Sequence, residues 1–206
     1  METFIDNNKQ LTHKDIEEAA KIMLNKTVIV SNQKTYRICE IEFYLRNKNH
    51  KDEYTHCNPD QKKYGKWYFH KFKNGTYKAG TFKGMDLTLG SKDNYCGILI
   101  RAIYDIEDDK MIEGPCKTVN ELIGNHGCKN VKEFMADKDD PLERNNSFIY
   151  ILDKPDLEEK ELYKGPRIGL SDKYPEWRDA NYRYVVMKNK IKKKKRSLVA
   201  VEKSLN

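Results

Sequence analysis

The apolar positions near the start of the chain predict an amphipathic helix. Thr12 stands where an N-cap residue is expected, and Asp15, three positions later, forms a short-acid variant of the capping box. The apolar residues that follow recur at intervals that place them on one helical face. They are Ile16, Ala19, Ala20, Met23 and Leu24. We therefore expect a helix that begins after Thr12 and packs this face against a core.

After Asn25 the pattern changes to the period of two that is typical of β-strands. A short β-branched run at residues 27–30 precedes a long strand at residues 35–45. One face of the long strand carries Glu40 and Glu42 among apolar side chains. A buried strand accepts two carboxylates only when they are paired or functional. The alternative is a solvated edge face, and the pattern leaves both interpretations open.

Further runs predict a chain dominated by a sheet. Asn74-Gly75 separates aromatic-rich runs at residues 66–73 and 76–82, which predicts a β-hairpin. A capping box from Thr118 to Glu121 predicts the start of a second helix. Other strands are expected at residues 86–89, 97–103, 148–152, 167–170 and 182–186, and loops at 46–60 and 137–147. The expected fold class is α+β, a single domain with a mostly antiparallel, curved sheet and surrounding helices.

Composition narrows the class of protein. The length of 206 residues suits one domain, or one domain with a tail. No apolar stretch approaches the roughly 18 residues that cross a membrane, and the N-terminus lacks the regions of a signal peptide. Five widely spaced cysteines, without a Cys-x-x-Cys pair, argue for reduced thiols over disulfides or a zinc site. We expect an intracellular protein, nuclear or cytoplasmic, without a membrane partner.

The net charge of +7 comes from one short run. Between Lys188 and Arg196, seven of nine residues are basic, whereas residues 1–187 contain 31 basic and 31 acidic side chains. We therefore divide the chain into a body at residues 1–187 and a basic C-terminal extension at residues 188–206. A disordered solvated tail and a nuclear-targeting segment are alternative interpretations of the extension.

A second concentration of positive charge lies inside the body. Residues 61–83 contain seven lysines and no acidic residue, interleaved with aromatic side chains. Ammonium groups beside aromatic rings suit a polyanion with stackable bases, such as nucleic acid. An ordinary hairpin with buried rings and solvated lysines produces the same alternation, so the pattern alone favours that simpler interpretation.

Six short blocks, in order, resemble the alkyladenine (3-methyladenine) DNA glycosylase family. Glu40-Ile-Glu42-Phe-Tyr44 resembles the family's Glu-Thr-Glu-Ala-Tyr catalytic strand, with His56 in the following loop. The other blocks are Gly65-Lys-Trp-Tyr68-Phe-His70, Gly97-Ile-Leu-Ile-Arg101-Ala, Gly114-Pro115-Cys-Lys117, Pro166-Arg167-Ile168-Gly169 and Tyr182-Arg183-Tyr184. Together they span about residues 20–186. The resemblance implies an alkyladenine-glycosylase-like fold.

The resemblance also implies a catalytic group. Glu42 would be the general base that activates water, with Arg101 and the carbonyl of Ile168 holding the water beside it. The water would attack C1′ of a flipped-out nucleotide while the base departs. The base pocket would consist of Tyr44, His56, Tyr68, His70 and Asp86. Nucleic acid would be bound by Lys71, Phe72, Lys73, Lys117, Arg167 and Arg183.

Three of these positions depart from the family's pattern. His70 replaces a stacking tyrosine, Lys73 replaces the tyrosine that wedges into the duplex, and Asp86 replaces a pocket asparagine that discriminates bases. The catalytic residues match the family while these substrate-reading positions differ. The resemblance thus implies a monomeric, monofunctional hydrolase of N-glycosidic bonds in base excision repair, acting on a modified base in DNA without metal or cofactor. The alternatives are a non-catalytic nucleic-acid binding module on the same scaffold and a hydrolase of free nucleosides or nucleotides.

Overall fold

The strands form one sheet in the computed structural model, which describes residues 12–136 and 148–202. Every strand pair within these residues is antiparallel. The main path runs β10-β8-β9-β2-β5-β4-β3, while β1 pairs with β2 and β7, and β6 pairs with β5. The strands are β1 (Thr27–Ser31), β2 (Lys34–Arg46), β3 (Tyr64–Phe69), β4 (Met85–Leu89), β5 (Tyr95–Asp105), β6 (Lys110–Glu113), β7 (Ile149–Asp153), β8 (Tyr163–Gly165), β9 (Arg183–Val185) and β10 (Val199–Ala200).

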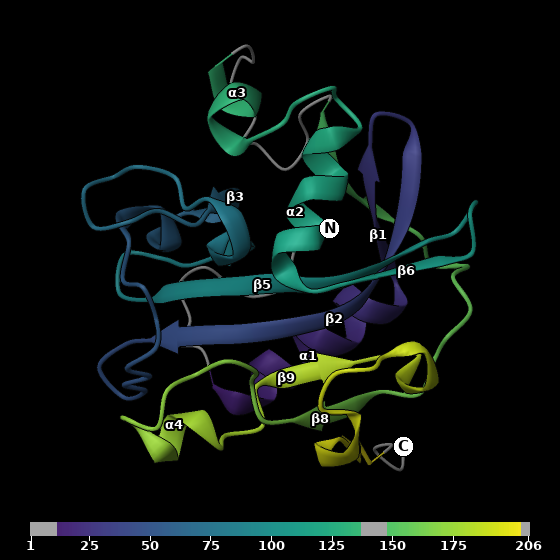
Figure 1. Cartoon of the computed structure of the whole chain (residues 1–206). Coiled ribbons are helices and arrows are strands. Elements are labelled where there is room, and N and C mark those ends of the chain that lie inside the picture. Colours follow the sequence, from purple (N-terminus) through teal and green to yellow (C-terminus); the bar gives the residue numbers. More distant parts are fainter. Residues whose placement is uncertain (1–11, 137–147, 203–206) are drawn as a thin grey trace.

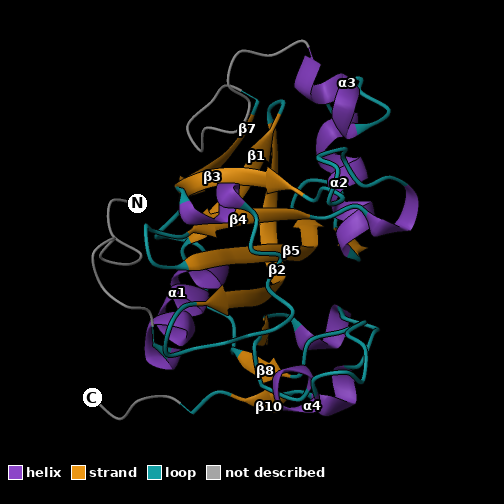
Figure 2. Ribbon diagram, turned by 90° about the vertical axis from the view of Figure 1, so that its left-hand side faces the viewer, coloured by secondary structure: helices purple, strands orange, loops and turns teal. Residues whose placement is uncertain are grey.

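Helices lie on both sides of this sheet (Figure 1). In the turned view α1 lies on one side of the strands, and α2 and α3 lie on the other (Figure 2). The α-helices are α1 (His13–Asn25), α2 (Pro115–Gly124), α3 (Val131–Ala136) and α4 (Pro175–Arg178). Short 3₁₀ turns are η1 (Pro59–Lys62), η2 (Gly80–Phe82), η3 (Lys188–Lys190) and η4 (Lys195–Ser197). This arrangement confirms the α+β class.

The first helix forms for the reasons that the sequence indicates. The Thr12 side chain accepts from the backbone of Asp15, and the Asp15 carboxylate accepts from the backbone of Thr12, so the capping box is complete. The predicted apolar stripe is buried along its whole length. Its members pack in the same core as β2 and β5, which fixes α1 against the centre of the sheet.

The long strand β2 lies in the middle of the sheet. It pairs with β5 along most of one edge. On its other edge it pairs first with β1, through Val28–Ser31 opposite Lys34–Arg37, and then with β9, where Glu40 to Glu42 lie opposite Arg183 to Val185. The two carboxylates of β2 are therefore enclosed by strands on both sides. This position determines the chemistry of the site described below.

The predicted hairpin around Asn74-Gly75 forms only in part. Lys71 and Tyr77 make an isolated antiparallel bridge across the turn, but residues 76–82 form no strand. β3 pairs instead with β4, whose five residues are all buried. The Phe82 side chain is 71% exposed, so the run at 76–82 lacks the buried face that would hold it in a sheet. The prediction of a second strand there is wrong.

Two other predicted elements are displaced. The second helix begins at Pro115, which occupies its first turn after Gly114, so Thr118 lies inside the helix and does not cap it. Residues 167–170 form no strand, because the Arg167 side chain turns into the core and Gly169 has a φ of +82°. The adjacent strand is β8, which pairs with β9.

The basic extension continues to pack on the body as far as the structure describes it. Ile191, Leu198 and Val201 are buried in the main core, and β10 pairs with β8. The strands expected at 148–152 and 182–186 are present as β7 and β9. The loop expected at 137–147 lies outside the described residues. Among the helices of the described chain, none is both long and apolar enough to cross a membrane.

Candidate active site

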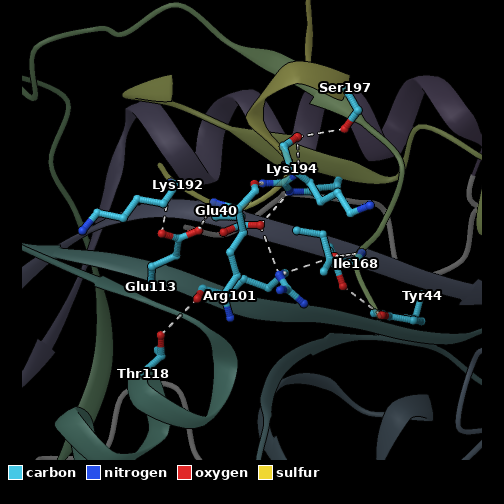
Figure 3. Close-up of polar contacts among 12 residues, drawn as sticks. Glu40, Tyr44, Arg101, Glu113, Thr118, Ile168, Lys192, Lys194 and Ser197 are labelled. Atoms are coloured by element: carbon cyan, nitrogen blue, oxygen red, sulfur yellow. Dashed lines mark hydrogen bonds and ion pairs between the residues drawn. The ribbon is translucent and has the colours of Figure 1, made fainter. Parts of the chain in front are cut away.

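Glu40 and Glu42 are the centre of the candidate site. Their exposed fractions are 1% and 0%, so the interpretation of their strand as a solvated edge face is wrong. Both side chains meet basic groups from neighbouring strands. Figure 3 shows Glu40 beside Arg101. Two buried carboxylates in one strand are tolerated because charged and hydrogen-bonding partners replace the water that they lose.

Arg101 reaches both carboxylates from β5. Its Nε lies 3.1 Å from an oxygen of Glu40 and 3.4 Å from Oε1 of Glu42. In the β2–β5 register Glu40 faces Ala102 and Ile41 faces Ile100, so Arg101 is the extra residue of an irregularity. Such β-bulges redirect side chains beside functional sites. Arg101 thus lies at a β-bulge, and its guanidinium lies within reach of both carboxylates.

Both Glu42 oxygens are hydrogen-bonded. Oε1 accepts the backbone N–H of Ile168 at 2.7 Å, and Oε2 accepts the hydroxyl of Tyr44 at 2.9 Å. Ile168 is therefore beside Glu42, as the resemblance implies, but the contact in this structure is through its amide and not its carbonyl. The arrangement fixes the carboxylate in one orientation.

Burial raises the pKa of Glu42, and the Arg101 guanidinium and the Ile168 amide offset only part of this rise. Burial also raises the pKa of Tyr44 well above its ordinary value, and the nearby Glu42 adds to this effect. Tyr44 therefore keeps its proton, and its hydroxyl donates a hydrogen bond to Glu42. A carboxylate with a raised pKa is a stronger base and is better able to accept a proton from water.

A cavity of about 360 Å³ lies beside Tyr44. Four of the five predicted base-pocket residues line it, namely Tyr44, His56, His70 and Asp86. The fifth, Tyr68, lies next to it, because its hydroxyl is 3.5 Å from Nδ1 of His56. The sequence did not indicate the rest of the lining, which comes mainly from the loop after β2. These residues are Glu53, Tyr54, Thr55, Gln61 and Leu170.

Polar rings form one wall of this cavity. The His56 and His70 ring centroids are 4.6 Å apart, nearly perpendicular, and His70 Nε2 lies 2.7 Å from an oxygen of the buried Asp86. Burial, followed by the effect of His70, lowers the pKa of His56 to about 4. His56 is therefore neutral at pH 7, so one ring nitrogen donates and the other accepts a hydrogen bond.

Two glycines that the sequence did not assign to the site, Gly84 and Gly97, make room for this wall. A Cβ at Gly84 would lie 2.6 Å from the His70 ring, and one at Gly97 would lie 2.6 Å from an oxygen of Asp86. Any larger residue would therefore displace His70 or Asp86. A glycine inside a strand often marks a position where another group approaches the backbone closely. Gly97, inside the buried strand β5, is such a glycine, and the sequence alone could have indicated it.

Two arginines expected at the nucleic-acid surface are buried instead. Arg167 is 4% exposed, pairs with both oxygens of Asp52 at 2.6 and 3.0 Å, and stacks on the Tyr44 ring at 4.5 Å. Arg183 is 0% exposed, and its Nε donates to Glu40 at 2.6 Å. Neither guanidinium faces solvent, so both lie behind the candidate site and not at a surface that nucleic acid could reach.

The other four predicted binding residues lie nearer the surface. Phe72 is 48% exposed and Lys73 is exposed at the turn after β3, while Lys117 is exposed in the first turn of α2. Lys71 is half-buried and pairs with Asp60 at 3.3 Å. The described residues contain no group of three His, Cys, Asp or Glu side chains that could hold a metal ion.

Comparison with known proteins gives one extensive relative. No protein-family model matches the chain. The chain is 45% identical over 194 residues to the "Uncharacterized protein L759" of Acanthamoeba polyphaga mimivirus, and the aligned part covers 88% of this chain and 90% of the viral protein. The similarity therefore extends over most of the length of both proteins.

Proposed function

The chain belongs to the same family as the mimivirus protein L759, and within that family we propose a function from the site itself. The proposed activity is hydrolysis of the N-glycosidic bond of a modified or damaged base in nucleic acid. Glu42 activates the water, and the cavity beside Tyr44 receives the base. By family resemblance the nucleic acid is DNA, the base is an alkylated or deaminated purine, and the setting is base excision repair.

One observation carries this proposal. The Glu42 carboxylate, whose pKa is raised by burial, is one hydrogen bond away from the cavity, because Tyr44 both donates to Glu42 and lines the cavity wall. A proton acceptor next to a base-sized recess is the arrangement that this hydrolysis requires. In support of the proposal, four of the predicted pocket residues line this recess although they come from four separate parts of the chain.

The reaction follows from these positions. A water molecule that replaces one partner of Glu42 gives its proton to the carboxylate as its oxygen bonds to C1′. The bond from C1′ to the base nitrogen breaks, and the base leaves with the bonding electrons. Glu42 also stabilises the positive charge that develops on the sugar, while the nearby Arg101 guanidinium lowers the pKa of Glu42 and so favours its ionised form.

The cavity wall indicates how this site would differ in base recognition. His70 is held edge-on to His56 and fixed by Asp86, so the wall presents polar ring edges in addition to ring faces. Polar edges at fixed positions suit a base with complementary donors and acceptors. The substrate is thus expected to be a base whose modification alters its hydrogen-bonding edge.

The test is base release from oligonucleotides that contain 1,N6-ethenoadenine, hypoxanthine or 3-methyladenine. We expect release by the native protein and a loss of at least about 100-fold in Glu42→Gln, which keeps the shape but not the basicity. Tyr44→Phe is the matched variant, because it removes only the hydroxyl that orients Glu42, and a smaller loss is expected. Absence of release from all three substrates, or equal release by Glu42→Gln, would reject the proposal.

A non-catalytic nucleic-acid binding module is the second candidate. The observation in its favour is that Glu42 is 0% exposed and both of its oxygens already have partners, which is also the arrangement of a purely structural ion pair. On this hypothesis Glu42→Gln leaves every activity unchanged, whereas substitution of Lys71 and Lys73 weakens salt-sensitive binding. Hydrolysis of free nucleosides without polynucleotide binding would instead identify a nucleoside hydrolase.

A further inference from the structure

The C-terminal basic run forms an ordered segment that we name the basic strap, residues 188–198. It follows β9 and is held at both ends by apolar side chains, since Ile191 is 0% and Leu198 is 4% exposed within the main core. β10 then continues the sheet by pairing with β8. The strap therefore has a defined path over the body (Figure 1).

Main-chain atoms of residues 192–194 make the polar contacts that hold the middle of the strap. The Glu113 carboxylate accepts the backbone N–H groups of Lys192 and Lys193 at 3.1 and 2.8 Å. Arg183 donates to the carbonyls of Lys193 and Lys194 at 2.9 and 3.3 Å. Because these anchors use the backbone, they leave the side chains of residues 192–196 available to another partner. The side chains of Lys188 and Lys190, by contrast, bind the Leu198 carbonyl and Asp109.

The free side chains form a row of five consecutive positive charges. Lys192, Lys193, Lys194, Lys195 and Arg196 are all exposed. None of the five makes an ion pair with any residue in the described part of the chain. The neighbouring acidic groups already have partners: Asp109 pairs with Lys190, Asp108 pairs with Lys34, and Glu113 binds the strap backbone. The row thus keeps its charge.

The strap lies next to the candidate site. It borders a groove of about 970 Å³ whose other wall is formed by the residues around β6 and by the start of α2. That wall carries Lys110 and Lys117 together with four acidic residues, Asp108, Asp109, Glu113 and Glu121, so the excess of positive charge lies on the strap side. The same start of α2 is bound to the site, because Gly114 N–H donates to the carbonyl of Arg101 at 2.7 Å. On the strap side, Arg183 joins the backbone of Lys193 to Glu40. Figure 3 shows strap residues and Arg101 on either side of Glu40.

Exposed aromatic rings lie on the other side of the start of α2. Phe72 and Phe82 are 48% and 71% exposed in the loop between β3 and β4. This loop touches α2, where the Cys116 thiol donates to the carbonyl of Gly80 at 2.9 Å. The surface around α2 therefore offers ammonium groups on one side and stackable rings on the other, and nucleic acid carries ligands for both.

We propose that the basic strap binds the phosphate backbone of nucleic acid beside the site that contains Glu42. A strand that lies along the groove would place its phosphates against the strap and its bases toward the loop with Phe72. The inference deepens the proposed function and rests on it for the nature of the partner, but its test does not depend on base release. An acidic polypeptide would use the positive charge but would leave the exposed rings without a specific role.

The test compares two variants with the same change of charge. The strap variant carries Lys192→Gln, Lys193→Gln, Lys194→Gln, Lys195→Gln and Arg196→Gln. The control variant carries Lys14→Gln, Lys26→Gln, Lys92→Gln, Lys129→Gln and Lys132→Gln, at exposed lysines outside the strap and the loop. Both should keep the native melting temperature, because the anchors of the strap are backbone atoms and buried apolar side chains.

Binding is measured by fluorescence anisotropy on an unmodified duplex of about 20 base pairs between 50 and 200 mM salt. We expect the strap variant to bind at least about 10-fold more weakly than the control variant at 100 mM salt. Its salt slope should be shallower by about 4, because each phosphate contact to a duplex contributes about 0.9. Equal weakening in both variants, or no binding by the native protein, would overturn the proposal.

Two further outcomes separate the hypotheses. Polyglutamate of equal charge that competes as well as the duplex would overturn the assignment to nucleic acid and identify an acidic protein partner. Strap-dependent binding without any base release would support the strap and reject the proposed hydrolysis alone. Base release with unchanged binding by the strap variant would reject the strap alone.

Discussion

His56 combines an exposed outer edge with a ring that packs against other rings of the cavity wall. Burial on the cavity side and the nearby His70 lower its pKa to about 4 from 6.5. Folding therefore favours the neutral ring, and the unfolded chain binds a proton between pH 6.5 and 4 that the folded chain does not. The titration of His56 therefore leaves the unfolding free energy unchanged above pH 6.5. It lowers the unfolding free energy as the pH falls from 6.5 toward 4.

We therefore predict that the His56 ring, followed by NMR, titrates well below pH 6.5. The native protein should also lose more unfolding free energy between pH 6.5 and 4.5 than His56→Gln, because glutamine cannot be protonated. Solvent at the exposed edge reduces the size of this difference. A titration midpoint at or above 6.5, or identical pH profiles for the two proteins, would contradict the prediction.

At the scale of single residues, the sequence identified several polar residues of the site but not every residue that pairs with them. Glu42, Tyr44 and Arg101 meet in space as the resemblance implies. Asp52, which neutralises Arg167, lies in a loop whose sequence has no pattern that assigns it a partner. Which carboxylate meets which guanidinium depends on how the loops fold over the sheet, and residue spacing within one strand contains no information about that.

Among the elements, β2 carries the site because its alternate residues point to one side. Glu40, Glu42 and Tyr44 are spaced by two, so one strand supplies the paired carboxylate, the proposed base and its hydroxyl partner. Glu40 shares one oxygen with Arg101 and Arg183, at 3.1 and 2.6 Å. The pairing of β2 with β5 and β9 is thus reinforced by side-chain ion pairs.

This arrangement predicts a large effect of removing one partner. Arg183→Met leaves Glu40 buried with Arg101 alone and frees two strap carbonyls, so we expect a loss of about 3–5 kcal/mol in unfolding free energy. The measurement is urea denaturation. Lys164→Met is the control, because it breaks the more exposed pair with Glu17 and should cost less than about 1 kcal/mol.

A double variant tests whether the charge is the cause. Glu40→Gln with Arg183→Met removes both members of the pair, and it should recover part of the lost stability because no uncompensated carboxylate is left. A double variant as unstable as the sum of the two single variants would show that Arg183 acts through its packing and its strap contacts alone.

The elements that were predicted incorrectly share a physical cause. Residues 76–82 and 167–170 alternate like strands, but neither run finds both a buried face and a free edge of the sheet. β4 and β8 occupy the available positions instead. Alternation of apolar and polar residues indicates which segments could form a strand. The number of free sheet edges then decides which of these segments do form a strand.

On the scale of the whole molecule, the C-terminal segment packs against the core and is part of the fold. Ile191, Leu198 and Val201 belong to the main core, and Arg183 is satisfied by strap carbonyls. We predict that deletion of residues 188–206 lowers the unfolding free energy by on the order of 5 kcal/mol, from the three buried aliphatic side chains alone. The measurement is thermal and urea unfolding of the truncated chain.

The strap variant described above is the control for this deletion, because it removes the charge and keeps the apolar anchors. It should unfold at the native midpoint while the truncated chain does not. A truncated chain as stable as the native protein would show that the segment behaves as a tail. Equal destabilisation of both would show that the lysine side chains themselves support the fold.

The sequence by itself determined the α+β class, the capped first helix, the long strand with its carboxylates at alternate positions, and the concentration of charge in two segments. These features depend on neighbours within a few positions, where periodicity and capping act. Only the tertiary structure decided that Glu40 and Glu42 are buried, that Arg167 and Arg183 face inward, and that the basic strap is anchored beside the site. Those outcomes depend on ion pairs between residues as many as 143 positions apart, whose formation requires the packed core.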